Sequence, residues 1–107
     1  MTQAHYSTTE TPTMDALLSA LDETIRSMPN QEFSSHEFIL ALVGGRQRAY
    51  VDALNQYPND PEPFTALHMR IGEELGESAL VVKIGEMESY NMFARRSRCG
   101  VWRRRDD

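Results

Sequence analysis

Apolar residues recur at three- and four-residue steps near the start of the chain, which is the period of an amphipathic helix. The positions in this stripe are Met14, Leu17, Leu18, Leu21, Ile25 and Met28. Thr11-Pro12 supplies a start signal, because threonine caps backbone N–H groups and proline fits the first helical position. Pro29-Asn30 ends the pattern. We predict a core-facing helix here, after a flexible polar tail over residues 1–13.

A second helix has the best local start signal in the chain. The segment Ser34-Ser-His-Glu37 has capping-box spacing, and Phe33 and Phe38 are placed around it as a hydrophobic staple. The helix is therefore expected to begin at about Ser35. Apolar positions continue in helical phase despite Gly44-Gly45, which favours one long weakened helix or two nearly collinear ones. These positions are Ile39, Leu42, Val43, Tyr50, Leu54 and Tyr57.

A third helix is predicted after the proline-rich segment Tyr57–Pro63, with Asp60 or Glu62 before a proline in its first turn. It is expected to end near Gly76. Its buried stripe is predicted to be Phe64, Leu67, Ile71 and Leu75. Its other surface carries Thr65, Met69, Arg70, Glu73, Glu74 and Glu77. His68 lies beside the apolar stripe, where a partly buried, hydrogen-bonded histidine is expected.

The last part of the chain has the composition of strands. Leu80–Glu86 is rich in β-branched residues, and Gly100–Arg104 is its expected antiparallel partner. The residues between them, 87–99, are too many for a tight turn and are predicted to form a long loop. Trp102 is expected to fill the core beneath this hairpin.

The predicted order is helix, short extended piece, two helices and a β-hairpin. This α+β order resembles a winged helix-turn-helix domain over residues 14–105, except for the extra helical length between residues 35 and 57. The resemblance implies that the helix before the hairpin enters the DNA major groove and that the hairpin loop, the wing, touches the backbone or minor groove. The binding residues that it implies are Thr65, His68, Met69 and Arg70 on the helix and Arg95, Arg96 and Arg98 on the wing.

Charge is distributed unevenly along the chain, whose formal net charge is −5. Residues 1–94 hold five Lys+Arg and fourteen Asp+Glu, a net of −9, whereas residues 95–107 hold six arginines and two aspartates, a net of +4. Clustered guanidinium groups suit phosphate or carboxylate recognition. With the resemblance, this charge pattern favours a regulatory, non-catalytic domain that binds nucleic acid, with duplex DNA as its expected ligand.

The same charges leave a protein-interaction module of winged-helix shape open as an alternative. In that case the basic hairpin docks on an acidic partner surface, with Tyr90, Arg98 or Trp102 as anchors, or the acidic face meets a basic partner. A third alternative is that Arg103–Arg105 form a solvated terminal run, partly neutralised by Asp106 and Asp107. The glutamates on the third predicted helix favour this alternative, because they repel phosphates. Tyr90 and Phe93 beside the arginines also suit stacking with single-stranded nucleic acid.

The sequence carries no signature of an enzyme, a cofactor site or a metal site. No arrangement of serine, histidine and aspartate has a recognisable motif, and neither His36 nor His68 has a second ligand at metal-binding spacing. Gly44-Gly45 with its following arginines matches neither phosphate-binding glycine motif. We therefore expect no catalysis, no cofactor and no metal.

The compartment follows from what the sequence lacks. The longest apolar run, Phe38–Val43, has six residues, whereas a membrane span needs about 20. Cys99 is the only cysteine and so has no partner for an internal disulfide, and no cleavable leader pattern opens the chain. A single soluble domain in the cytoplasm, with no membrane partner, is the expectation.

Overall fold

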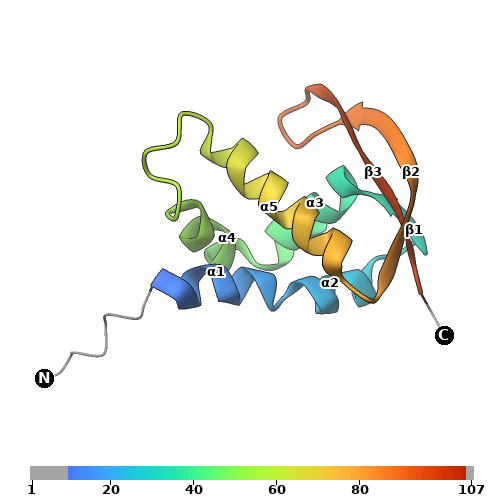
Figure 1. Ribbon diagram of the computed structural model, residues 1–107, viewed down its shortest axis with the longest axis horizontal. Coiled ribbons are helices and arrows are strands. Elements are labelled where there is room, and N and C mark those ends of the chain that lie inside the picture. The colour runs from blue at the N-terminus through green and yellow to red at the C-terminus, as the bar shows by residue number, and fades with distance from the viewer. Residues whose placement is uncertain (1–9, 106–107) are drawn as a thin grey trace, which may run out of the picture.

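The helices precede an antiparallel hairpin that closes the chain (Figure 1). The computed structural model describes residues 10–105. The helices are α1 Glu10–Leu18, α2 Leu21–Ser27, α3 Ser35–Gly45, α4 Gln47–Leu54 and α5 Pro63–Glu77. The strands are β1 Glu32–Ser34, β2 Val81–Tyr90 and β3 Arg96–Arg104. The predicted α+β class, with a helical domain closed by a C-terminal hairpin, is confirmed.

Helix α1 begins inside the segment predicted to be a tail. It starts at Glu10, so Thr11-Pro12 lies in its first turn rather than before it. The tail predicted over residues 1–13 is therefore too long. Its first part, residues 1–9, lies outside the described residues.

The first predicted helix is divided into α1 and α2. The break falls at Ser19 and Ala20, where the N–H of Ala20 bonds to the carbonyl of Leu17 at 3.0 Å, three residues back. The hydroxyl of Ser19 also donates to the carbonyl of Ala16 at 3.2 Å, and such side-chain bonds compete with the helical backbone pattern. The apolar stripe survives the break, because Leu17 and Ile25 are both fully buried.

Helix α3 starts as the capping box predicts. The Ser34 hydroxyl accepts from the N–H of Glu37 at 3.1 Å, and the Glu37 carboxylate accepts from the N–H of Ser34 at 2.8 Å. The rings of Phe33 and Phe38 stack with centroids 5.9 Å apart and are both buried. The staple and the box together fix the direction in which α3 leaves β1.

Two helices, rather than one, fill the segment after the capping box. Helix α3 ends at Gly45 and α4 begins at Gln47. Arg46 between them has φ −140° and ψ 56°, which lies outside the helical region. The paired glycines just before it weaken the helix at this point, so of the two predicted alternatives the divided one is correct.

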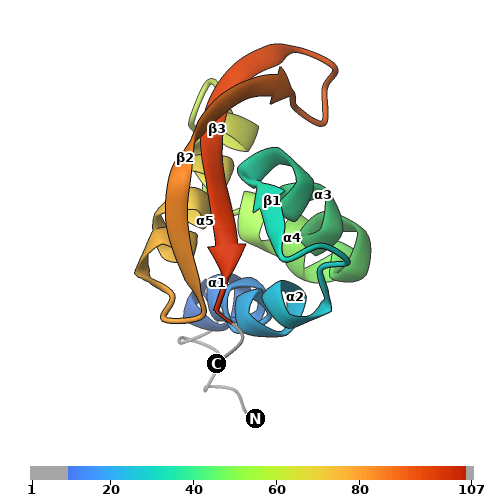
Figure 2. The ribbon, with the colours of Figure 1, turned by 90° about the vertical axis from the view of Figure 1, so that its right-hand side faces the viewer.

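The three strands form one antiparallel sheet in the order β1-β3-β2. Strand β1 pairs only with residues 101–103 of β3. Strand β2 pairs with β3 from Val81 opposite Arg104 to Tyr90 opposite Arg96, with a register shift between Lys83 and Gly85. Figure 2 shows the consequence: the far half of the hairpin curves past the end of β1 as a two-stranded ribbon.

The strands of the hairpin are longer than predicted, and the long loop expected over residues 87–99 is wrong. Only residues 91–95 join the strands. The added strand residues, 87–90 and 96–99, are mostly exposed and mostly polar or charged, so they lack the apolar alternation that marks a strand in the sequence. Asn91 closes the loop, because its side-chain oxygen accepts from the N–H groups of Phe93 at 2.9 Å and Arg95 at 3.1 Å.

The hydrophobic core lies where the helices meet the base of the hairpin. Trp102, with 7% of its surface exposed, extends the core under the sheet as predicted. The most deeply buried large side chains are Phe38, Leu17, Ile25, Leu42, Leu67, Ile71 and Leu75. Because these come from α1, α2, α3 and α5, one core holds the helices together, and from the far half of the hairpin Met92 packs against it.

Candidate nucleic-acid interface

A hollow of about 400 Å³ lies between helix α5, the N-terminus of α3 and the inner face of the hairpin. A second hollow of about 570 Å³ lies between the N-terminus of α5 and the loop of the hairpin. Thr65 and Asn91 line both, so the two hollows adjoin. We call them together the hairpin groove.

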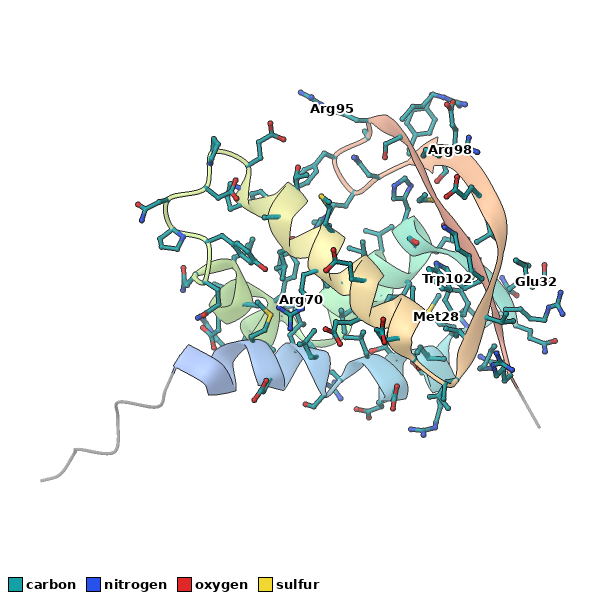
Figure 3. The ribbon with its side chains drawn as sticks, in the orientation of Figure 1. Met28, Glu32, Arg70, Arg95, Arg98 and Trp102 are labelled. Atoms are coloured by element: carbon teal, nitrogen blue, oxygen red, sulfur yellow. The ribbon has the colours of Figure 1, made fainter. Side chains whose placement is uncertain are left out.

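The hairpin groove brings together five of the seven predicted binding residues. Thr65, His68, Met69 and Arg98 line the first hollow, and Arg95 lines the second with Thr65. The helix residues and the hairpin residues are about 30 positions apart in the chain, and α5 and the hairpin loop place them across one groove. Figure 3 shows Arg95 and Arg98 at the hairpin.

The other two predicted residues, Arg70 and Arg96, do not line the groove. Arg70 points elsewhere on α5 and pairs with Glu74, one turn on, at 3.1 Å; Figure 3 shows it well apart from the hairpin arginines. Arg96 pairs with Glu88 across the strands at 3.0 Å, and its guanidinium lies 5.7 Å from the ring centre of Tyr90. Neither residue is positioned by the fold to share a ligand with the helix residues in the groove.

Glutamates on β2 partly neutralise the arginines of the hairpin. Arg98 pairs with Glu86 at 2.7 Å, in the same way that Arg96 pairs with Glu88. Hydrogen bonds from Lys83 and Arg98 lower the pKa of the Glu86 carboxyl below its ordinary value. Within the described residues Arg95 makes no ion pair. Among the hairpin arginines, the one on the loop is therefore the least compensated by carboxylates. Exposed pairs of this kind are weak.

The arginines at the end of the chain have structural roles that the sequence did not indicate. Arg104 donates to the carbonyls of Ile25 at 3.2 Å and Met28 at 3.0 Å, and so caps the C-terminal end of α2. Arg103 pairs with Glu32 of β1 at 3.5 Å. The cluster of arginines seen in the sequence is therefore divided between the hairpin groove and the end of β3 near α2.

His36, at the start of α3, touches both strands of the hairpin. Its Nδ1 lies 2.7 Å from the Ser89 hydroxyl on β2, and its Nε2 lies 3.0 Å from the Ser97 hydroxyl on β3. Partial burial lowers the pKa of the imidazole. The sequence gives no sign of this contact, because no local pattern relates position 36 to serines more than 50 residues away.

His68 links α5 to α4 and to the hairpin loop. Its Nε2 lies 2.6 Å from the hydroxyl of Tyr50, and its ring stacks on Phe93 with centroids 6.3 Å apart. Burial, and then repulsion from His36, lower the pKa of His68, while burial raises the pKa of Tyr50 to about 12. The expected partly buried, hydrogen-bonded histidine is what the structure contains.

Phe64 was predicted to lie in the core, and that prediction is wrong. It is 39% exposed and packs edge-on against Phe93 of the hairpin loop, with ring centroids 5.1 Å apart. Phe93 is 47% exposed and Met69 is 62% exposed. Helical periodicity placed Phe64 in the core stripe, but the first turn of α5 extends beyond the core and meets the hairpin instead.

Comparison with known proteins adds no relative. No protein-family model, curated protein or solved structure matches this chain.

The chemistry that the groove offers is hydrogen bonding, positive charge and aromatic contact. A serine beside a histidine resembles half of a hydrolase triad, but the second nitrogen of His36 meets the Ser89 hydroxyl rather than the carboxylate that stabilises an imidazolium. Within residues 10–105 no three side chains are grouped to hold a metal ion. Among the same residues no helix is long and apolar enough to cross a membrane.

Proposed function

We propose that this chain is a non-catalytic nucleic-acid-binding domain, in a regulatory role, whose ligand is duplex DNA. One observation carries the proposal: Thr65, His68 and Met69 of α5 line the same groove as arginines of the hairpin. Threonine and methionine suit contacts with base edges and thymine methyl groups, while guanidinium groups suit phosphates. The order of helices and strands, which resembles a winged helix-turn-helix domain, supports the same assignment.

The charges of α5 limit where the DNA lies. Glu73, Glu74 and Glu77 all belong to the second half of the helix, so phosphates are repelled from that half. The first half carries the positive end of the helix dipole and faces Arg95 across the groove. The proposed contact is therefore confined to the N-terminal half of α5 and the hairpin.

The test is a titration of labelled random-sequence duplex DNA, followed by fluorescence anisotropy at two salt concentrations. Phosphate contacts predict affinity that falls steeply as salt rises. Reversing the two groove arginines, Arg95→Glu with Arg98→Glu, is expected to abolish binding. The matched control is Arg26→Glu with Arg48→Glu on α2 and α4, which changes the net charge equally outside the groove. No binding at low salt, or equal losses in both variants, contradicts the proposal.

A protein partner is the second candidate, and the exposed apolar side chains favour it. Phe64, Met69 and Phe93 are 39%, 62% and 47% exposed and all line the hairpin groove. Aromatic and methionine side chains beside arginine are typical of protein interfaces, and the arginines select an acidic partner. A pull-down with the intact chain tests this candidate. A stoichiometric protein that is captured by the wild type and by the Arg26/Arg48 control, but lost with the groove variant, would support it.

A further inference from the structure

We infer that His36 is a positioning residue that holds the hairpin at a fixed distance from α5 and thereby sets the width of the hairpin groove. The role of His36 in holding the hairpin does not depend on a bound ligand. Only its consequence for DNA affinity rests on the proposed function.

The position of the imidazole carries the inference. Ser89 and Ser97 face each other across the two strands, and the two ring nitrogens of His36 meet one hydroxyl each, at 2.7 and 3.0 Å. One side chain from α3 thus contacts both strands at the same position along the hairpin. A single bond to one strand would leave the ribbon free to twist about it, whereas two bonds restrict its tilt.

This contact lies where the sheet gives no support. Strand β1 reaches only to residues 101–103 of β3, so the ribbon beyond has no third strand beside it. An isolated two-stranded ribbon is at best marginally stable in water. Besides His36, the far half is held to the helices by the rings of Phe64 and His68 on Phe93 and by a 4.0 Å contact from the Tyr50 hydroxyl to Met92 sulfur.

The residue before His36 anchors the base of the same ribbon. The Ser35 hydroxyl accepts from the indole of Trp102 at 2.9 Å and lies 3.4 Å from the carbonyl of Gly100. Adjacent residues of α3 therefore hold the base and the middle of the hairpin, and Phe93 holds its tip. The first hollow of the groove, lined by His36, Ser97 and Thr65, lies between these anchors. Its width is fixed before any ligand arrives.

Histidine suits this task chemically. A neutral imidazole offers one donor and one acceptor, and a serine hydroxyl can take either role, so both bonds are satisfied in either tautomer. Burial lowers the pKa of His36, which keeps the neutral form. Phenylalanine has a similar ring and makes neither bond, which makes His36→Phe the informative replacement.

Amide hydrogen exchange followed by mass spectrometry tests the inference on the free protein. In His36→Phe, and separately in Ser89→Ala with Ser97→Ala, exchange in residues 86–98 is expected to quicken at least roughly tenfold, because local opening of the ribbon becomes easier. Exchange in residues 67–75 of α5 is expected to stay unchanged. His36→Asn, which keeps one donor and one acceptor on a shorter side chain, is expected to recover part of the protection. The control is Ser19→Ala, which removes an exposed hydroxyl on the far helix pair.

The exchange rates in the hairpin and in α5 together decide whether His36 holds the hairpin. Unchanged exchange in the hairpin of both variants overturns the inference, and so does equal acceleration throughout α5, which indicates only a general loss of stability. The labelling rate of Cys99, which lines the groove and lies 3.8 Å from Ser89, is an independent measure and is expected to rise with the hairpin exchange.

The DNA titration separates this inference from the proposed function. If DNA binds, His36→Phe is expected to lower affinity with an unchanged salt slope, because no phosphate contact is removed. Loss of the arginines lowers affinity and the slope together. If DNA does not bind at all, the proposed function fails and the exchange result still decides the role of His36.

Discussion

The indole N–H of Trp102 donates a hydrogen bond to the hydroxyl of Ser35 at 2.9 Å, joining the central strand of the sheet to the first turn of α3. Trp102 is paired with Phe33 on one side and Lys83 on the other, in the only part of the sheet that is three strands wide. The bond therefore fixes the base of the hairpin to the helical core, and the rest of the hairpin projects from this base.

Removing the Ser35 hydroxyl is expected to destabilise the fold. In Ser35→Ala the indole N–H of the buried Trp102 loses its partner, which costs about 1–3 kcal/mol in the free energy of unfolding. In Trp102→Phe the donor is gone, so adding Ser35→Ala is expected to cost clearly less than it does in the wild type. Urea unfolding followed by far-ultraviolet circular dichroism measures all three variants. An equal cost of Ser35→Ala in both backgrounds would show that the bond contributes nothing.

Two glycines against the Trp102 ring form a matched pair for testing how tightly it is packed. A Cβ at Gly100 would lie 3.0 Å from the indole nitrogen and 3.1 Å from Cε2, whereas at Gly76 the nearest indole atom is 3.6 Å away. Gly100→Ala is therefore expected to cost about 1–3 kcal/mol through overpacking. Gly76→Ala, in the last turn of α5, is expected to be neutral or to stabilise by up to about 1 kcal/mol. Thermal unfolding of both variants decides, and a neutral Gly100→Ala would mean that the ring is free to shift.

Those contacts illustrate which parts of the fold the sequence predicts. The start of α3 was predicted correctly because every part of its signal, from Phe33 to Phe38, lies within six consecutive residues. The buried stripe of α5 was predicted for Leu67, Ile71 and Leu75, since burial on one face leaves a helical period in the sequence. Local chemistry and one-sided burial are both visible without the structure.

The groove was predicted only in part, because its geometry depends on residues far apart in the chain. His36 meets serines 53 and 61 positions away, and Arg104 caps α2 across more than 70 residues. Glutamates and arginines pair across the outer half of the hairpin, and their alternation resembles a charged loop in a sequence. Phe64 continues the helical period of the core stripe in the sequence. It is nevertheless exposed, because the first turn of α5 extends beyond the core.

Stability is expected to fall as the solution becomes moderately acidic. Burial lowers the pKa of both His36 and His68 in the folded state below the ordinary 6.5, so the unfolded chain binds protons more readily. The free energy of unfolding is then constant well above pH 6.5 and decreases as the pH falls through 6.5. Urea unfolding at pH 7.5 and 5.5 measures the decrease. The variant His36→Asn with His68→Gln should show a smaller difference between the two pH values, and an unchanged difference would assign it to other groups.

Removing the glutamates that pair with hairpin arginines is expected to strengthen DNA binding. Glu86 pairs with Arg98 of the groove at 2.7 Å, and Glu88 pairs with Arg96 on the same strand at 3.0 Å, so in the free protein both carboxylates lower the positive charge that the hairpin offers to phosphates. Glu86→Gln with Glu88→Gln keeps the side-chain volume and removes both charges. Because exposed pairs are weak, the expected fall in the dissociation constant is modest, roughly three- to tenfold at low salt.

The control for this gain carries the same change of charge elsewhere on the molecule. Asp15→Asn with Asp22→Asn removes two exposed carboxylates from α1 and α2, outside the hairpin groove. Anisotropy titrations of the wild type and both variants at two salt concentrations make the comparison. A gain only in the hairpin variant means that carboxylates and phosphates compete for the same arginines. An equal gain in both variants would reduce the effect to net charge and would remove the hairpin from the proposed interface.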